Sequence, residues 1–566
     1  MKEVTIPDTV ANVGGSAFTG CWKLETIHLQ EDSDYVVDDG VLFNKTKTRL
    51  IRYLKNASRR SYTIPDSVKT IDSCAFYSSF RSEYEYGLGL TGSITIPDSV
   101  TSIGDYAFYY NSASGLSIPA SAESIGQYAF AYCTNLTDVT IPGSVKTVNK
   151  YTFTDCTQLG NVTICNGVES IDEKAFHNCS SITSIVIPDS VTKIGTNIFS
   201  ECTGLKEVTF PDMLLDIAGS ALTGCVNLTD IYVYGNSDNY TSINGILFSK
   251  DKTKLILYPP GRKDESYVVP KNVISIGKNA FNGSAALKTL TISENAVDIP
   301  YSLGSAGVET LIVDSDLTIS NDIYKTVNGE RYKTELFCKD MSNLKTLIIN
   351  GNACIQDRAF ENQIDNLTHL ENLIIKGQTS IGNYAFASFS WIGSDYNYET
   401  GDYEEVEYGL KRLDLTGVTG IGDYAFEKCQ CVENVLFGES LVTIGKYAFS
   451  SSYYNDPACI RITELDLPDS LRSIGPYAFA NCTGITKLHM SKNLETLGSY
   501  AFSGCPIRNS VLMPDSLKYV AEELRSSKSQ IPSGNIMPDI SSFVLWIPGR
   551  FSYQLWKNDS TDVLTY

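Results

Sequence analysis

Short stretches of alternating apolar and polar residues recur along the chain at intervals of about 23 residues. One unit begins at Leu136 with the pattern L-x-x-V-x-I, whose period of two predicts a strand with one buried face. Pro142 ends that strand because it has no N–H to donate. Val145 and Val148 then predict a second inward-facing stretch, followed by a single helical turn that carries Phe153.

The phrase that closes each unit is roughly I-G-x-x-A-F-x-x-C, and it recurs about fifteen times. Five consecutive copies place an apolar residue at the same position, 23 residues apart: Phe130, Phe153, Phe176, Phe199 and Leu222. A fixed period of this length indicates stacked supersecondary units rather than one globule. We therefore expect a solenoid whose core is a column of aromatic rings and whose outside is a long surface.

The phrases I-P-D-S-V, I-G-x-Y-A-F and C-x-x-L resemble the leucine-rich repeats of the BspA-like (Treponema pallidum-type) family. The resemblance runs from Val4 to about Leu517 and is weakest between Ile299 and Met341. It implies an α/β fold, namely a curved, right-handed leucine-rich-repeat solenoid with a parallel β-sheet on its concave face. It also implies a secreted or cell-surface protein used in adhesion and protein binding. The family has no catalytic motif, so the resemblance implies no enzyme.

The repeat pattern predicts one continuous solenoid over 1–517 and a capping segment over 518–566. Residues 40–76 align without a gap with 245–281, and both copies predict a β-hairpin inserted into the solenoid. The expected irregularities are variant hairpin repeats near 36–62 and 240–267, an irregular segment over 299–343, and inserts at 77–92, 389–409 and 450–460.

The net charge of −20 and a pI near 4.7 disfavour nucleic acids and anionic membrane surfaces, both of which attract basic proteins. No apolar run approaches the ~18 residues needed to span a bilayer. No export signal precedes the first strand phrase, so we expect a segment of a longer protein or a chain without its signal. The expected location is extracellular or at the cell surface, as the family resemblance implies.

Nine of the fifteen cysteines lie three residues after the repeat Phe or its Leu equivalent, which predicts a ladder of small, buried, reduced thiols rather than disulfides. The other six, including Cys459, look scattered. None of the four histidines lies in a metal-binding or catalytic motif, so we expect no metal, cofactor or catalytic residue. The nine repeat cysteines are Cys21, Cys133, Cys156, Cys179, Cys202, Cys225, Cys429, Cys482 and Cys505.

The inserts are the main candidate for a binding site. All three enter between the helical turn and the next strand, so they should emerge along one edge of the solenoid, where insertions often form a binding face. Their aromatic residues suit both protein hot spots and sugar stacking. The middle insert also carries six carboxylates and no Lys or Arg. The candidate residues are Tyr84, Tyr86, Trp391, Tyr396, Tyr398, Tyr403, Tyr408, Tyr453 and Tyr454.

We therefore expect a non-catalytic protein that binds a protein partner, such as a basic host surface or matrix protein. A carbohydrate-binding surface protein that uses the same aromatic side chains is the alternative, and a passive structural spacer is the third possibility. The inserts could also be surface loops without a partner. A second candidate surface is the outward row of Ile312, Ile348 and Ile374, which either binds a partner or is covered by the 314–343 segment.

Overall fold

The structure is a computed structural model, and it forms two compact units: Met1–Lys263 with Gly277–Ala286, and Asp264–Ile276 with Leu287–Tyr566. It describes residues 2–21, 24–54, 60–77, 92–214, 217, 220–235, 239–299, 303, 306–320, 324–327, 330–333, 341–361, 367–396, 403–450, 458–509, 511–520, 543–546 and 553–555.

The first unit contains short strands and one 3-10 helix. These elements are β1 (Glu3–Ile6), η1 (Gly15–Phe18), β2 (Thr26–Leu29), β3 (Tyr35–Asp38), β4 (Val41–Asn44), β5 (Arg49–Tyr53), β6 (Tyr62–Thr63), β7 (Thr70–Ile71), β8 (Ser93–Thr95), β9 (Ser102–Ile103), β10 (Gly115–Leu116), β11 (Ser124–Ile125), β12 (Asp138–Ile141), β13 (Thr147–Val148), β14 (Asn161–Ile164), β15 (Ser170–Ile171), β16 (Ser184–Val186), β17 (Lys193–Ile194), β18 (Glu207–Phe210), β19 (Asp230–Val233), β20 (Tyr240–Ile243), β21 (Ile246–Ser249) and β22 (Lys254–Leu257).

The second unit continues with strands. These are β23 (Ser266–Val268), β24 (Ser275–Ile276), β25 (Thr289–Ile292), β26 (Thr310–Val313), β27 (Leu317–Ile319), β28 (Tyr324–Val327), β29 (Glu330–Lys333), β30 (Thr346–Ile349), β31 (Ala353–Ile355), β32 (Asn372–Ile375), β33 (Thr379–Ile381), β34 (Ser390–Tyr396), β35 (Tyr403–Gly409), β36 (Arg412–Leu415), β37 (Val418–Ile421), β38 (Asn434–Phe437), β39 (Thr443–Ile444), β40 (Glu464–Asp466), β41 (Ser473–Ile474), β42 (Lys487–His489), β43 (Thr496–Leu497), β44 (Val511–Leu512), β45 (Tyr519–Val520), β46 (Phe543–Trp546) and β47 (Tyr553–Leu555).

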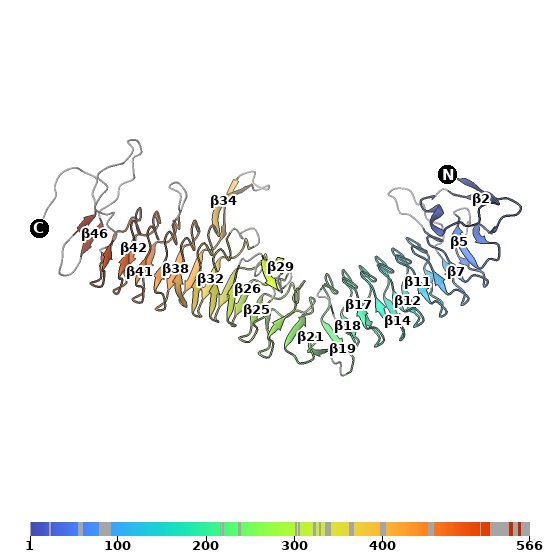
Figure 1. Ribbon diagram of the computed structural model, residues 1–566, viewed down its shortest axis with the longest axis horizontal. Coiled ribbons are helices and arrows are strands. Elements are labelled where there is room, and N and C mark those ends of the chain that lie inside the picture. Colours follow the sequence, from blue (N-terminus) through green and yellow to red (C-terminus); the bar gives the residue numbers. More distant parts are fainter. Residues whose placement is uncertain are drawn as a thin grey trace. The chain divides into compact units, whose positions relative to one another are not determined.

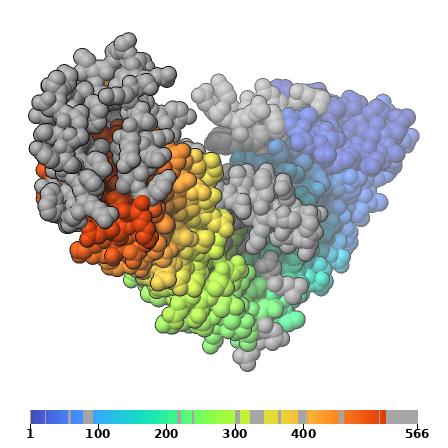
Figure 2. All heavy atoms as spheres, turned by 60° about the vertical axis from the view of Figure 1, so that its left-hand side comes forward, coloured from blue at the N-terminus to red at the C-terminus, as the bar shows by residue number. Residues whose placement is uncertain are grey.

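Regular coils contribute short strands to two rows of parallel strands, which are divided into several sheets in the first unit (Figure 1). In the first unit β12 pairs with β14, and β13 pairs with β15 and then β17. In the second unit the two rows reach seven strands (β23-β25-β26-β30-β32-β36-β38) and eight strands (β27-β31-β33-β37-β39-β41-β43-β45). Successive coils lie against one another within each unit (Figure 2). The predicted leucine-rich-repeat solenoid with parallel sheets is confirmed.

The repeat Phe residues form the predicted column. Phe153 is fully buried, and its ring is stacked between Phe130, at a centroid distance of 5.4 Å, and Phe176, at 5.3 Å, with the rings 5° and 8° from parallel. Leu222 takes the same position and is also buried. In the second unit the column consists of Phe360, Phe386, Phe426, Phe449, Phe479 and Phe502.

The single helical turn expected at each repeat Phe occurs among the described residues only at Phe18, in the 3-10 helix η1, and the expectation is wrong for the other coils. Every second N–H bonds to the next coil instead: Tyr128 N–H to the Lys150 carbonyl (3.2 Å) and Phe130 N–H to the Thr152 carbonyl (2.9 Å). Tyr128 has φ +55° and Tyr132 φ +61°, in the left-handed region that bulky residues rarely adopt. The turn is therefore held by the neighbouring coil, which a helix would not allow.

Two antiparallel segments occur in the first unit at an offset of 205 residues. Strands β3, β4 and β5 form one, and β20, β21 and β22 form the other. Each has an irregularity in register at the same place, between Leu42 and Phe43 in the first and between Leu247 and Phe248 in the second. The domain boundaries, with a cap over 518–566, stay a prediction, because most of that segment lies outside the described residues.

The repeat cysteines form a ladder along the core. The thiols of eight of the nine predicted cysteines lie against the backbone carbonyl of the Phe in the preceding coil, as Cys156 does against Phe130 (3.1 Å). The burial predicted for the ninth, Cys21, is wrong, because this residue is half-buried. Cys459, which we took as scattered, belongs to this ladder: its N–H bonds to the Phe449 carbonyl (3.3 Å) and its Sγ lies 3.8 Å from the Phe426 carbonyl. The first unit has Cys133, Cys156, Cys179, Cys202 and Cys225 in the ladder, and the second has Cys429, Cys459, Cys482 and Cys505.

Candidate functional site

The predicted site residues divide into two groups. Trp391 and Tyr396 lie in β34, and Tyr403 and Tyr408 lie in β35, so these four share one hairpin. The remaining five lie outside the described residues: Tyr84, Tyr86, Tyr398, Tyr453 and Tyr454.

The middle insert is an antiparallel hairpin that projects from the row of coils in the second unit (Figure 1). Seven residue pairs join β34 to β35, from Ser390 opposite Gly409 to Tyr396 opposite Tyr403. Tyr403 is 73% exposed. In the backbone register the acidic residues Asp395 and Glu404 are cross-strand partners. The register therefore concentrates negative charge on a protruding element.

The base of the hairpin is fixed to the coil. Ser390 is buried, its Oγ accepts a hydrogen bond from the Cys431 N–H (3.2 Å), and its carbonyl accepts one from the Gln430 N–H (3.4 Å). Phe389, just before β34, is fully buried and packs edge-to-face against Phe360 and Phe386. The core of the coil is thus closed before the hairpin begins.

One carboxylate of the hairpin is neutralised by the coils below it. Glu407 forms ion pairs with Arg461 and with Lys411 (3.7 Å), and Arg461 also pairs with Glu433 (3.6 Å). These contacts anchor β35. Of the other carboxylate residues of the insert, Asp395, Glu404 and Glu405 belong to the paired strands, and Glu399 and Asp402 lie outside the described residues.

A cluster of tyrosines in the first unit was missed by the sequence analysis. Tyr106, Tyr128 and Tyr151 stack in one ladder, with centroids 4.7 and 4.6 Å apart. A second ladder joins Tyr110 to Tyr132 at 4.3 Å. The signal that could have found the first ladder is the recurrence of Tyr two residues before the repeat Phe.

Tyr109 lies between the two ladders with its ring nearly perpendicular to both. Its centroid is 5.3 Å from Tyr106, at 63°, and 5.3 Å from Tyr132, at 70°. It also stacks on Tyr77 at 5.0 Å, and Tyr77 is the last described residue before the 78–91 segment. All of these side chains are half-buried. The turns that close successive coils therefore present a continuous aromatic surface.

The second unit has a single tyrosine ladder. It runs through Tyr384, Tyr424, Tyr447, Tyr477 and Tyr500, with centroids 4.5 to 5.2 Å apart. The Arg358 guanidinium lies 4.6 Å from the Tyr384 centroid, in the position that a ring would take in the preceding coil. In the first unit Lys174 ends the ladder in the same way, 5.7 Å from the Tyr151 centroid. The Tyr106–Tyr151 ladder and the ladder of the second unit therefore each have a cation at one end.

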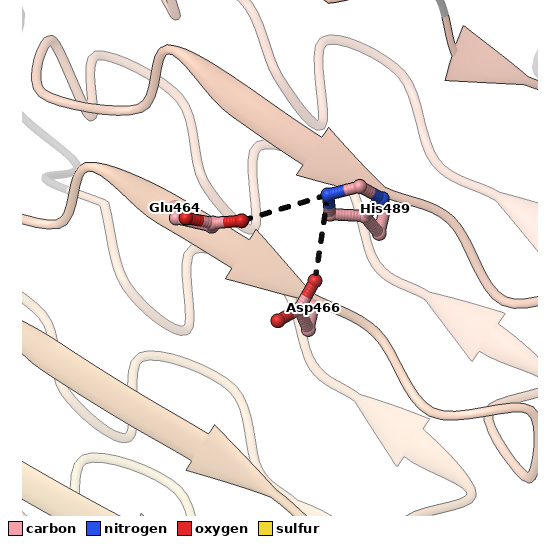
Figure 3. Close-up of side chains that lie close together, drawn as sticks. All are labelled: Glu464, Asp466 and His489. Atoms are coloured by element: carbon pink, nitrogen blue, oxygen red, sulfur yellow. Dashed lines mark ion pairs between the residues drawn. The ribbon is translucent and has the colours of Figure 1, made fainter.

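Among the described residues, one group of side chains could offer three ligand atoms to a metal ion: Glu464 and Asp466 on β40, and His489 on β42 (Figure 3). The His489 Nε2 lies 3.6 Å from Glu464 Oε1 and 3.8 Å from Asp466 Oδ1. All three residues are exposed, and Lys487 also pairs with Glu464 (3.4 Å). The group has the ordinary character of a surface ion-pair network, so we assign no ion to it.

The outward row of isoleucines is continuous in register, with Ile312 opposite Ile348 and Ile348 opposite Ile374. All three side chains are half-buried. The row ends at Asp414, which pairs with Lys376 at 2.5 Å. A partner on this row, or its cover by the 314–343 segment, stays a prediction.

The stacked parallel coils and the inward Phe column define a leucine-rich-repeat solenoid protein. A model of the BspA type leucine rich repeat region matches the chain over residues 1–80, 52–183, 169–263, 262–393 and 407–531. The chain belongs to this family, as the sequence phrases predicted. The family supports a protein-interaction scaffold as the coarse functional class of this chain, and leucine-rich-repeat proteins are typically non-catalytic.

Several solved structures are similar to parts of this chain. The pneumococcal vaccine antigen PcpA is 18% identical, with a TM-score of 0.39, and the match covers 78% of this chain and 93% of PcpA. A leucine rich cell surface protein from Faecalibacterium prausnitzii is 20% identical (TM-score 0.34, 83% and 97% covered), and a leucine-rich repeat protein from Bacteroides ovatus is 19% identical (TM-score 0.31, 87% and 94%). No curated protein matches the sequence. Within the described ranges, no helix has the length and hydropathy needed to cross a bilayer.

Proposed function

We propose that this chain is a non-catalytic binding protein that docks a basic protein partner on the β34–β35 hairpin. The single observation that carries the proposal is the hairpin itself: a protruding pair of strands with an acidic composition, anchored on a closed coil. We further propose an extracellular or cell-surface location, in line with the family. The complete reading frame tests that location by the presence of an export signal and an anchor.

The charge pattern supports a basic partner over a neutral one. The insert holds six carboxylates without a Lys or Arg, and Asp395 lies opposite Glu404. A basic partner would gain charge-assisted hydrogen bonds to carboxylates, and such bonds are stronger than neutral ones. The chain as a whole has a net charge of −20, which speeds the approach of basic partners.

The backbone of the hairpin supports strand addition as the docking mode. β34 and β35 form a two-stranded sheet, and no other described strand pairs with either of them. Unpaired strand edges are templates for an added strand, and alternate side chains of that strand then set the specificity. Tyr403, at 73% exposure, adds aromatic contact area near the tip.

The test separates the hairpin from the solenoid. Ser390 and Gly409 are cross-strand partners, so residues 391–408 can be replaced by an Asn-Gly turn without opening the coil. Phe389 must be kept because it fills the core. A milder variant combines Glu404→Lys with Glu405→Lys.

The matched control combines Asp98→Lys with Glu123→Lys, which changes the net charge by the same amount at exposed positions of the first unit. On an array of purified proteins of graded isoelectric point, the full chain should bind basic members, more weakly at high salt. The deletion and the hairpin charge variant should lose this binding, and the control should keep it. Equal loss in the control, or full binding by the deletion, would overturn the proposal.

A glycan array examines the carbohydrate alternative. Binding to a glycan that disappears with Trp391→Ala and Tyr398→Ala, together with no salt-dependent binding to basic proteins, would replace the protein partner with a sugar.

A further inference from the structure

The tyrosine cluster of the first unit is a preformed surface whose spacing restricts what can bind there. We infer that it binds a proline-rich segment in the polyproline II conformation, at a site separate from the hairpin. Its members are Tyr77, Tyr106, Tyr109, Tyr110, Tyr128, Tyr132 and Tyr151, and we call them the tyrosine cluster.

The stacking of the cluster determines which parts of the rings a ligand can reach. Tyr106 and Tyr128 are 7° from parallel at 4.7 Å, and Tyr110 and Tyr132 are 9° from parallel at 4.3 Å, so each ring covers a face of its neighbour. Ring edges and phenol groups therefore make up much of the accessible surface. This surface does not suit a sugar, which stacks on an open ring face. It suits a ligand that packs against ring edges and accepts hydrogen bonds.

The repeat length of the ladder matches one extended conformation. Two steps of the ladder, from Tyr106 through Tyr128 to Tyr151, together cover about 9.3 Å. A polyproline II helix has three residues per turn and ~3.1 Å per residue, so its side chains repeat on one face every ~9.3 Å. Every third residue of such a segment would meet every second coil.

Other peptide conformations do not keep this register. A β-strand repeats on one face every ~6.6 Å, and an α-helix every ~5.4 Å. The turn of an α-helix is longer than the 4.7 Å distance between neighbouring rings, so its side chains would move out of register by about 0.7 Å at each coil. The side chains on one face of a β-strand would already miss the second ring. The rings are therefore spaced for a polyproline II segment lying along the coil axis.

The hydrogen-bonding chemistry agrees with the spacing. A polyproline II segment makes no internal hydrogen bonds, so its carbonyl groups need donors. Burial raises the pKa of Tyr109, so its phenol stays protonated and can donate at neutral pH. Because the rings are already packed against one another, binding orders few side chains.

The chain itself offers substitutions that preserve the turn. Tyr132 lies at φ +61°, and the equivalent position two coils later is Asn178 at φ +55°. The position of Tyr109, directly after the repeat Phe, is occupied by Ala131 in the next coil. Tyr132→Asn and Tyr109→Ala should therefore fold. The control Tyr447→Asn removes a ring from the single ladder of the second unit.

The test measures fluorescence anisotropy of a labelled ten-residue polyproline peptide with the full chain. We expect saturable binding, no binding of a Gly-Ser peptide of the same length, and at least a tenfold loss of affinity in Tyr109→Ala and Tyr132→Asn but not in Tyr447→Asn. The variant without residues 391–408 should keep this binding, whatever its effect on basic proteins. Absence of saturable binding, equal binding of the Gly-Ser peptide, or loss in the control or the hairpin deletion would overturn the inference.

Discussion

Removing one ring from the Phe column tests how the solenoid is held together. Phe153 is fully buried between Phe130 and Phe176. Phe153→Ala deletes the ring and leaves a cavity, which costs about 3–5 kcal/mol in a core. Phe153→Leu keeps an apolar side chain and loses two stacked pairs, each worth roughly 0.5–1.5 kcal/mol, so about 1–3 kcal/mol in total. The chain already carries Leu222 in this position, so the Leu variant has a native precedent.

Because each coil touches only its neighbours, the loss should be local. Hydrogen exchange at increasing guanidinium concentration, resolved by peptide, measures the opening free energy coil by coil. We expect both variants to weaken the coils of Phe130 and Phe176 most, the Ala variant more than the Leu variant, with distant coils unchanged. A loss below 1 kcal/mol for Phe153→Ala, or a uniform loss along the unit, would refute the stacked-column reasoning.

Three further predictions concern the thiols and the turns. Cys354 is the exposed cysteine among those described, so alkylation of the folded chain followed by peptide mapping should label it first, and early labelling of a ladder thiol would contradict the burial of the ladder. Burial also raises the pKa of the ladder thiols, to about 12 for Cys133 and Cys202, whereas an unfolded thiol loses its proton near pH 8.5. The folded state therefore holds protons that the unfolded state releases, so stability should fall above about pH 9, by roughly 1.4 kcal/mol per thiol per pH unit, and a urea midpoint that stays constant from pH 8 to 11 would disprove this. Tyr151, at φ +59°, should tolerate Asn better than Ala by about 1 kcal/mol in thermal unfolding, because Asn accepts the left-handed region and Asn197 occupies it two coils later; equal losses would show that the backbone is not strained.

The column of Phe residues could be predicted from the sequence because it depends on one period alone. The turn before each Phe could not, because its N–H groups alternate between their own coil and the next, as Tyr128 and Phe130 show. Periodicity within one unit carries no information about hydrogen bonds between units. The expected helix was the result of reading a local pattern without its neighbours.

The tyrosine cluster and Cys459 were missed for related reasons. Tyr109 contacts residues from three coils, and no phrase of the sequence places those residues together. Cys459 lies ten residues after Phe449 rather than three, because an insert separates them, so the F-x-x-C spacing is lost although the contact is kept. Three-dimensional register, rather than spacing, identifies both. The hairpin residues were found because an insert is visible as a change of spacing.

The inserts can vary because the coil closes independently of them. In a regular coil the Cys133 N–H bonds to the Phe130 carbonyl (3.3 Å). Phe389 makes the same bond to Phe386 (3.1 Å) before the hairpin starts, whereas Cys459 makes it to Phe449 (3.3 Å) after the 450–457 segment. An insertion on either side of this bond leaves the ring column and the thiol ladder in register. The stability of the solenoid therefore does not depend on the sequence of the inserts. Variants of the hairpin should change binding, while the unfolding free energy of the coils beneath it stays the same.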